Sequence, residues 1–265
     1  MSQESCSHDG VNTDPTRGDS AGVPWEGRSF QPNPNAGDDG SADPVLLAEL
    51  QSFRAGAGSQ AAVVRAFRDA RVLIPLLAER GDEGVGPTGL TVDKTQELSI
   101  FTVAAPDGRS AQPVFTSVET LAAWDREARP IPVAASRVAL SAASEDSDLV
   151  VIDPGQATEF VVRRPALWAI AQDQEWIPSF ESPEVATAFN ESIGQELAVI
   201  DIALSAGDPT ARLRGPELVV TLTLNAGLDR DELTAVTNRL AGRWSRDDRI
   251  AVLVDSLAVK LVSGD

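Results

Sequence analysis

The chain has 265 residues, 42% of them hydrophobic and 23% charged, and a formal net charge of −18. A chain this acidic repels phosphate groups, so neither nucleic acid nor an anionic membrane surface is expected to bind it. No apolar run approaches the roughly 20 residues of a membrane-spanning helix, and the N-terminus has no signal-peptide pattern, so the sequence predicts a cytoplasmic protein.

The rarest side chains limit the chemistry. His8 is the only histidine, Cys6 is the only cysteine, and there is no tyrosine. From residue 9 onward, Ser-His-Asp and Cys-His catalysis are therefore excluded, as is a zinc site with the usual nitrogen and sulfur ligands. We expect no catalytic residues, no metal and no cofactor. Any acid–base chemistry would fall to carboxylates or to the two lysines, Lys94 and Lys260.

Residues 1–43 are rich in Gly, Ser, Asp, Pro and Asn and are predicted to form a disordered acidic tail. Trp25 lies in this tail. An aromatic residue in such a segment favours docking onto the body or onto a partner, and the alternative is a solvated tail with an incidental tryptophan.

Helices are predicted where an apolar face of helical period follows a capping residue. Asp43 with Pro44, Ser59 and Ser182 each begin one. Thr116 and Glu119 form a capping-box pattern ahead of a helix that ends at Trp124. The predicted helices cover 45–54, 60–70, 118–124, 136–144, 165–172, 183–193 and a segment that opens at 229–232.

Strands are predicted where short apolar or alternating runs lie between turn residues. Pro106-Asp107-Gly108 joins two of them as an antiparallel pair, because glycine supplies a positive φ without steric cost. The predicted strands cover 71–79, 97–104, 109–115, 131–134, 148–153, 158–163, 196–204, 217–224, 250–254 and 257–261.

These elements predict an α+β fold. A mixed, largely antiparallel sheet with helices packed on it is expected over residues 44–178. A smaller C-terminal β-β-α-β unit, as an extension or a small domain, is expected over 179–265.

Candidate site residues gather around 93–124. Asp93 and Lys94 follow a glycine-rich loop at 80–90, and this lysine either holds an anionic group or forms an exposed ion pair of little energy. Thr116 and Ser117 begin a helix, whose free amides attract anions, although the capping box explains the same residues and is favoured. Arg109 completes the ligand-binding candidates. Trp124 joins Trp25 as an interaction candidate, with core packing as the alternative.

Several ordered motifs resemble the SseB N-terminal domain, in the form found in actinobacterial proteins. They are Arg71–Leu77, Asp93-Lys94, Glu97-Leu98, Pro106–Arg109, Pro113–Ser117, Trp124 and Phe160–Trp168. The resemblance covers roughly residues 21–178. It implies an α+β domain named for enhanced serine sensitivity, a phenotype linked to amino-acid metabolism, and it brings no accepted catalytic residues.

Three functions follow. The leading hypothesis is a non-catalytic regulatory module that binds another protein. The alternative is a sensor for an amino acid or related anionic metabolite, with Lys94 and Arg109 in the site. The third is a carboxylate-based hydrolase, which requires Asp93 to converge with Glu97 or Asp153.

Overall fold

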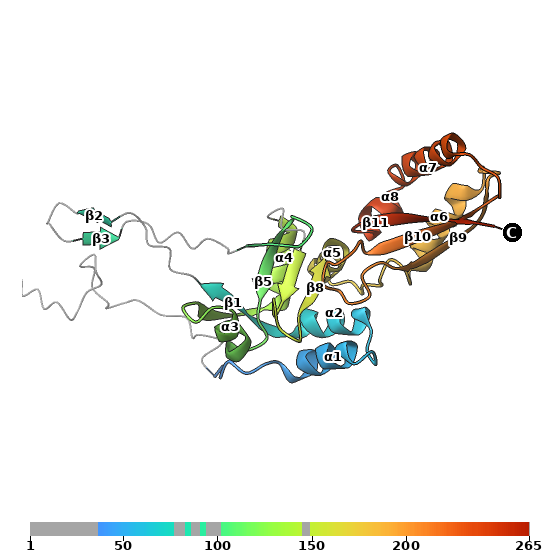
Figure 1. Ribbon diagram of the computed structural model, residues 1–265. Helices are drawn as coiled ribbons and strands as arrows, with labels where there is room; N and C mark the ends of the chain where they lie inside the picture. Colours follow the sequence, from blue (N-terminus) through green and yellow to red (C-terminus); the bar gives the residue numbers. More distant parts are fainter. Residues whose placement is uncertain (1–36, 77–82, 86–90, 94–101, 145–148, 265) are drawn as a thin grey trace, which may run out of the picture. The chain divides into compact units, whose positions relative to one another are not determined.

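The computed structural model describes residues 37–76, 83–85, 91–93, 102–144 and 149–264. The fold given below is that of residues 39–265, which group into one compact unit (Figure 1). The expected tail up to residue 36, with Trp25, lies outside the described residues, as do Lys94 and Glu97.

Helices and strands are interspersed along the described part of the chain. The helices are α1 (Pro44–Arg54), α2 (Gln60–Asp69), α3 (Val118–Trp124), α4 (Ala135–Ser144), α5 (Arg164–Ala171), α6 (Pro183–Ile193), α7 (Arg230–Trp244) and α8 (Asp248–Leu253). The strands are β1 (Arg71–Leu76), β2 (Glu83–Val85), β3 (Thr91–Asp93), β4 (Val103–Ala104), β5 (Ser110–Val114), β6 (Arg129–Ala134), β7 (Leu149–Ile152), β8 (Phe160–Arg163), β9 (Val199–Ala206), β10 (Leu218–Leu224) and β11 (Leu257–Ser263).

The first sheet has the order β4-β5-β7-β8. Its β5–β7 pair is parallel, and the pairs on either side are antiparallel. The β4–β5 turn contains Gly108 at φ 86°, as the turn pattern predicts. β1 and β6 form an antiparallel pair, and Leu73 and Phe115 join β1 to the end of β5 by two backbone hydrogen bonds of 2.8 Å. The mixed α+β fold expected from the sequence is confirmed.

The main hydrophobic core combines α1, α2, α4 and α5 with this sheet. Alternate residues of β7 and β8, such as Val150, Ile152 and Phe160, lie in it. Their neighbours on the same strands, such as Val151 and Val161, belong to a smaller cluster with Leu213 from the β9–β10 loop. Because both faces of β7 and β8 are buried, the sequences of these two strands are continuous apolar runs.

A second sheet with the order β11-β10-β9 carries the C-terminal part. β10 pairs antiparallel with β9 and parallel with β11. Every second residue of β10, from Leu218 to Leu224, is buried in a cluster with the inner faces of α6 and α7. The helix expected to open at 229–232 is α7, and its residues Val236, Leu240 and Trp244 are buried.

Three local predictions are wrong. The segment 80–90 was expected as a loop, but Glu83–Val85 form strand β2, which pairs antiparallel with β3. Residues 250–254 were expected as a strand, but α8 occupies 248–253, because the Asp247 side chain accepts the Arg249 amide and begins a helix. Thr116 was expected to cap α3 with Glu119, but Ser117 is the cap and its capping-box partner is Thr120. The Thr116 hydroxyl has a buried partner elsewhere, which leaves the cap to the next residue.

Candidate interaction surface

Arg109, a ligand-binding candidate from the sequence, is held by two carboxylates. Its Nη1 and Nη2 donate to Asp255 Oδ1 and Oδ2 at 2.8 and 3.0 Å, and its Nε donates to Asp107 Oδ2 at 2.8 Å. The hydrogen bonds that Arg109 donates to Asp255, opposed by partial burial, raise the pKa of Arg109 above its usual range. The guanidinium therefore acts as a link between the β4–β5 turn and the α8–β11 loop.

A second arginine, which the sequence reasoning missed, lies deeper in the same cluster. The buried Arg163, at the end of β8, donates to Asp255 Oδ2 at 3.0 Å and to Asp208 Oδ2 at 2.9 Å. It also donates to the Gly215 carbonyl at 3.0 Å. The only local signal is a charged residue closing an apolar strand. Arg163 and Asp255 are 92 residues apart, so no sequence motif contains both.

Glu217 adds a buried carboxylate behind this cluster. Burial raises the pKa of Glu217, and the Asp255 amide, which donates to Oε2 at 2.6 Å, opposes the shift. Asp255 itself is shifted the other way. Burial alone would raise the pKa of Asp255, but hydrogen bonds and charge from Arg109 and Arg163 hold it below its usual value. Glu217 Oε1 is buried without a hydrogen-bond partner among the described residues, whereas Arg109, Arg163, Asp208 and Asp255 are paired with one another. The paired groups join distant segments of the chain, so their arrangement indicates structural cross-linking.

The candidates Thr116 and Ser117 are also occupied. The backbone amide and the hydroxyl of Thr116 each donate at 2.8 Å to the fully buried Asp153 carboxylate, and the Thr158 hydroxyl donates to it at 2.7 Å. Asp153 adopts a left-handed φ of 47°, a region that aspartate tolerates better than most residues. Ser117 accepts the Thr120 amide as a helix cap. These contacts fix the β7–β8 turn and the start of α3.

The remaining candidates are dispersed or lie outside the described residues. Trp124 is half-buried, and its ring lies 5.2 Å from that of Phe115 in a small cluster with Leu73 and Leu121. Asp93 closes β3, and Asp153 is enclosed as described above. Among the described residues, no group of three or more His, Cys, Asp or Glu is placed to hold a metal ion.

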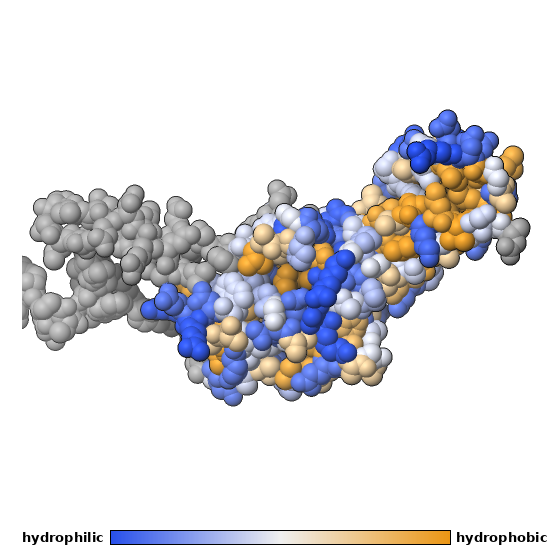
Figure 2. Space-filling view, viewed as in Figure 1, coloured by the Kyte–Doolittle hydropathy of each residue, from blue (hydrophilic) through white to orange (hydrophobic). Residues whose placement is uncertain are grey.

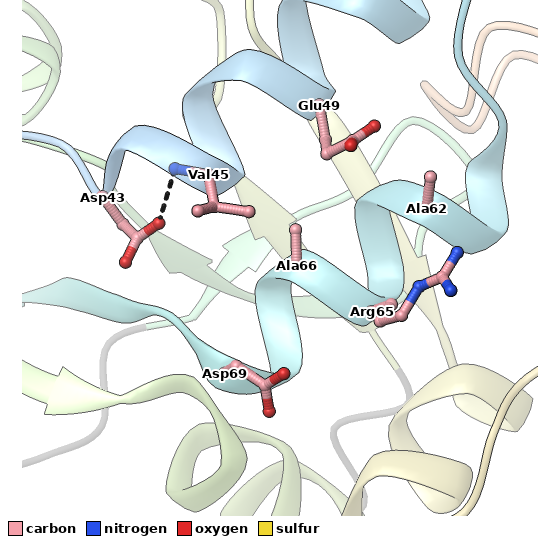
Figure 3. A pocket seen from close by; sticks show the side chains of 7 residues that line it. All are labelled: Asp43, Val45, Glu49, Ala62, Arg65, Ala66 and Asp69. Carbon is pink, nitrogen blue, oxygen red and sulfur yellow. Dashed lines mark hydrogen bonds between the residues drawn. The ribbon is translucent and has the colours of Figure 1, made fainter.

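A shallow groove of about 420 Å³ lies between α1 and α2 (Figure 3). It is lined by Val45, Ala62 and Ala66 and by the charged residues Glu49, Arg65 and Asp69. The fourth charged residue, Asp43, accepts the Val45 amide at 2.9 Å and serves as the α1 cap. The charged residues around the groove have both signs, and one of them, Asp43, is already engaged as a helix cap. The lining therefore does not identify a class of ligand.

The most distinctive exposed surface is the strand β11. Val259 and Leu261 are 38% and 41% exposed, although they lie in register with the buried Val220 and Leu222 and so share the sheet face that the helices cover. Val262, on the other face, is 39% exposed. Among the described strands β11 is hydrogen-bonded to β10 alone, so it is an edge strand with exposed aliphatic side chains on both faces.

An apolar hollow of about 340 Å³ adjoins the start of this strand. Six hydrophobic residues contribute to its lining: Ala241, Trp244, Ile250, Ala251, Val254 and Leu257. Hydrophobic surface extends over the region of α8 and β11 in Figure 2. We call β11 and this hollow the β11 edge. An edge strand presents unpaired N–H and C=O groups, so this surface combines backbone donors and acceptors with apolar contacts, the combination that a second β-strand satisfies.

No helix in the described part of the chain is both long enough and apolar enough to cross a membrane.

Comparison with known proteins gives one match. Residues 46–169 match the family model of the SseB protein N-terminal domain, a span that runs from α1 into α5 and includes the first sheet. Searches of the curated proteins and of the solved structures found no match. The β11 edge lies beyond the matched span. Residues 46–169 are therefore identified as an SseB N-terminal domain.

Proposed function

We propose that this SseB-family protein is a non-catalytic regulatory module that binds a protein partner through the β11 edge. The observation that carries the proposal is the exposure of Val259, Leu261 and Val262 on a strand that, among the described strands, is hydrogen-bonded to β10 alone. Aliphatic side chains on both faces of such a strand lose solvent contact when a further strand is added to the sheet.

The mode of binding follows from the backbone. A partner strand beside β11 pairs with the outward N–H and C=O groups, and its alternate side chains contact the two faces of the sheet. On the helix-covered face these side chains meet Val259, Leu261 and the hollow lined by Trp244 and Ile250. Backbone pairing supplies affinity, and the hollow supplies selection for a large apolar side chain.

The charged cluster supports this proposal by fixing the position of β11. Asp255 and Ser256 immediately precede the strand, and both accept hydrogen bonds from Arg163. The Leu218 amide donates to the Ser256 carbonyl at 3.0 Å. This bond joins the first residue of β10 to the residue that immediately precedes β11. A rigidly held strand loses little conformational freedom when it binds, which favours affinity.

A photo-crosslinking amino acid at position 261 tests the proposal in native cells. With the full chain, we expect irradiation to give discrete covalent adducts at position 261. The matched control is position 197, because Leu197 is 96% exposed and lies outside β11. Adducts that are absent at 261, or identical at both positions, would contradict a binding site at the β11 edge.

A further inference from the structure

The sequence of β11 allows this strand to pair with the same strand of a second copy of the chain. The strand reads Leu257-Ala258-Val259-Lys260-Leu261-Val262-Ser263, with Lys260 as its single charged residue. A two-fold axis perpendicular to the sheet places β11 antiparallel to the same strand of a second copy. Such an axis keeps the two faces of the sheet distinct, so apolar residues of the helix-covered face meet only residues of that face.

The position of the axis is restricted by charge and by shape. An axis through Lys260 sets the two lysines directly opposite each other, which is destabilising. An axis through Leu261 sets Ser263 opposite Val259 and leaves Leu257 without an apolar partner. An axis through Val259 pairs Val259 with itself and Leu257 with Leu261, and it sets Lys260 opposite Ala258.

The hollow gives independent support to the axis through Val259. Leu257 forms part of the hollow's wall, and in this register it lies opposite Leu261 of the second copy. That leucine points to the helix-covered face, as does Leu261 of the first copy, which is in register with the buried Leu222. The side chain therefore enters the hollow of about 340 Å³ beside Trp244 and Ile250. The same contact forms twice, once on each side of the axis.

We propose that β11 pairs antiparallel with β11 of a second copy of this chain, about a two-fold axis at Val259, and that Leu261 of each copy fills the hollow beside Leu257 of the other. The two three-stranded sheets then form one continuous sheet, and the dimer has no free β11 edge. The inference rests on the proposed function, because it names the partner of the same surface.

Mass measurement of the full chain by light scattering tests the dimer. We expect a species of twice 28.0 kDa that dissociates on dilution. Val259→Lys places two added charges at the axis and is expected to give a monomer with unchanged circular dichroism. Leu197→Lys makes the same chemical change at another exposed aliphatic residue and is expected to leave the dimer intact. A native chain that is monomeric at all concentrations, or a dimer insensitive to Val259→Lys, would overturn the inference.

Disulfide trapping tests the register. In a Cys6→Ser background, Val259→Cys is expected to give a covalent dimer on oxidation, because directly opposed strand residues have Cα atoms about 4.5–5.5 Å apart, within disulfide range. Val262→Cys is the control on the same strand. In the proposed register its copies are six positions apart along the strand, roughly 20 Å, and no disulfide forms. Equal trapping at both positions would overturn the register.

The two proposals fail separately. Photo-crosslinking at position 261 to a different protein, together with a monomeric chain, would refute the second copy as occupant and retain the β11 edge as a binding site. Absence of adducts at 261 and a monomeric mass would refute both.

Discussion

Arg163 is the residue on which the charged cluster depends. It bridges the buried carboxylates of Asp208 and Asp255 and also binds the Gly215 carbonyl. Arg109 provides a second partner for Asp255, but no other arginine or lysine among the described residues pairs with Asp208. Loss of Arg163 therefore leaves Asp208 as a buried charge without its cation.

We predict that Arg163→Met lowers the free energy of unfolding by about 3–5 kcal/mol, the range for removing one partner of a buried pair. Chemical denaturation at pH 7 measures the change. Arg65→Met, on the exposed face of α2, is the matched control and is expected to leave the unfolding midpoint almost unchanged. An equally small effect at Arg163 would show that solvent reaches the cluster and screens it.

The raised pKa of Glu217 and the lowered pKa of Asp255 make the free energy of unfolding depend on pH in opposite directions. Burial raises the pKa of Glu217, so the folded chain keeps this proton to a higher pH than the unfolded chain, whose glutamates titrate near about 4.3. As the pH rises from there through the folded pKa, stability contributed by Glu217 is lost. Asp255 has a lowered pKa, so the stability that it contributes to the folded chain is instead lost as the pH falls below the pKa of an unfolded aspartate, about 3.9.

Glu217→Gln removes the first of these effects, because glutamine carries no charge at any pH and its carbonyl replaces the acceptor for the Asp255 amide. We predict that the variant gains stability over the native chain as the pH rises above about 4.3, until the folded Glu217 is itself ionised. Denaturation curves at a series of pH values measure the gain. A constant difference across the series would assign the effect to packing and contradict a titrating Glu217.

At the scale of the elements, the helix starts could be predicted from the sequence because their signals are local. Asp43, Ser59, Ser182 and Asp229 all lie next to the helix they begin, and each side chain accepts a backbone amide of the first turn. Thr116 shows the limit of such signals. Its hydroxyl is within reach of Asp153, 37 residues away, and that buried contact moves the cap to Ser117.

Short apolar runs mark the second limit. Ile250 to Val254 is compatible with a strand or a helix, since five residues do not separate the two periods. The Asp247 cap and the Ile250 carbonyl, which accepts the Val254 amide, decide for the helix. β11, a similar run, was predicted correctly as a strand, but its place at the edge of the sheet depends on which strands pair and is absent from its own residues.

The candidate site could be predicted from the sequence less well than the fold. Arg109 was selected as a ligand-binding residue because of its motif, but its partner Asp255 is 146 residues away. Arg163 was missed for the same reason. Side chains that cross-link distant segments and side chains that bind ligands have the same chemistry, and only the fold distinguishes them.

For the whole molecule, the net charge of −18 opposes the self-association that the β11 edge favours. The proposed contact is apolar, and its only charged strand residue, Lys260, faces Ala258. Added salt therefore has little effect on the attraction at the interface, but it screens the repulsion between the two acidic chains. An interface built on ion pairs would respond in the opposite direction.

We predict that dimerisation strengthens several-fold as sodium chloride is raised from about 10 mM to about 150 mM, where the screening length falls from about 30 Å to about 8 Å. Sedimentation equilibrium measures the dissociation constant at each salt concentration. The effect is expected to level off at higher salt, because the repulsion is by then screened, whereas a salting-out effect would continue to grow. A dimer that dissociates when salt is added would exclude the apolar β11 contact as its main source of affinity, since screening strengthens that contact between chains of like charge.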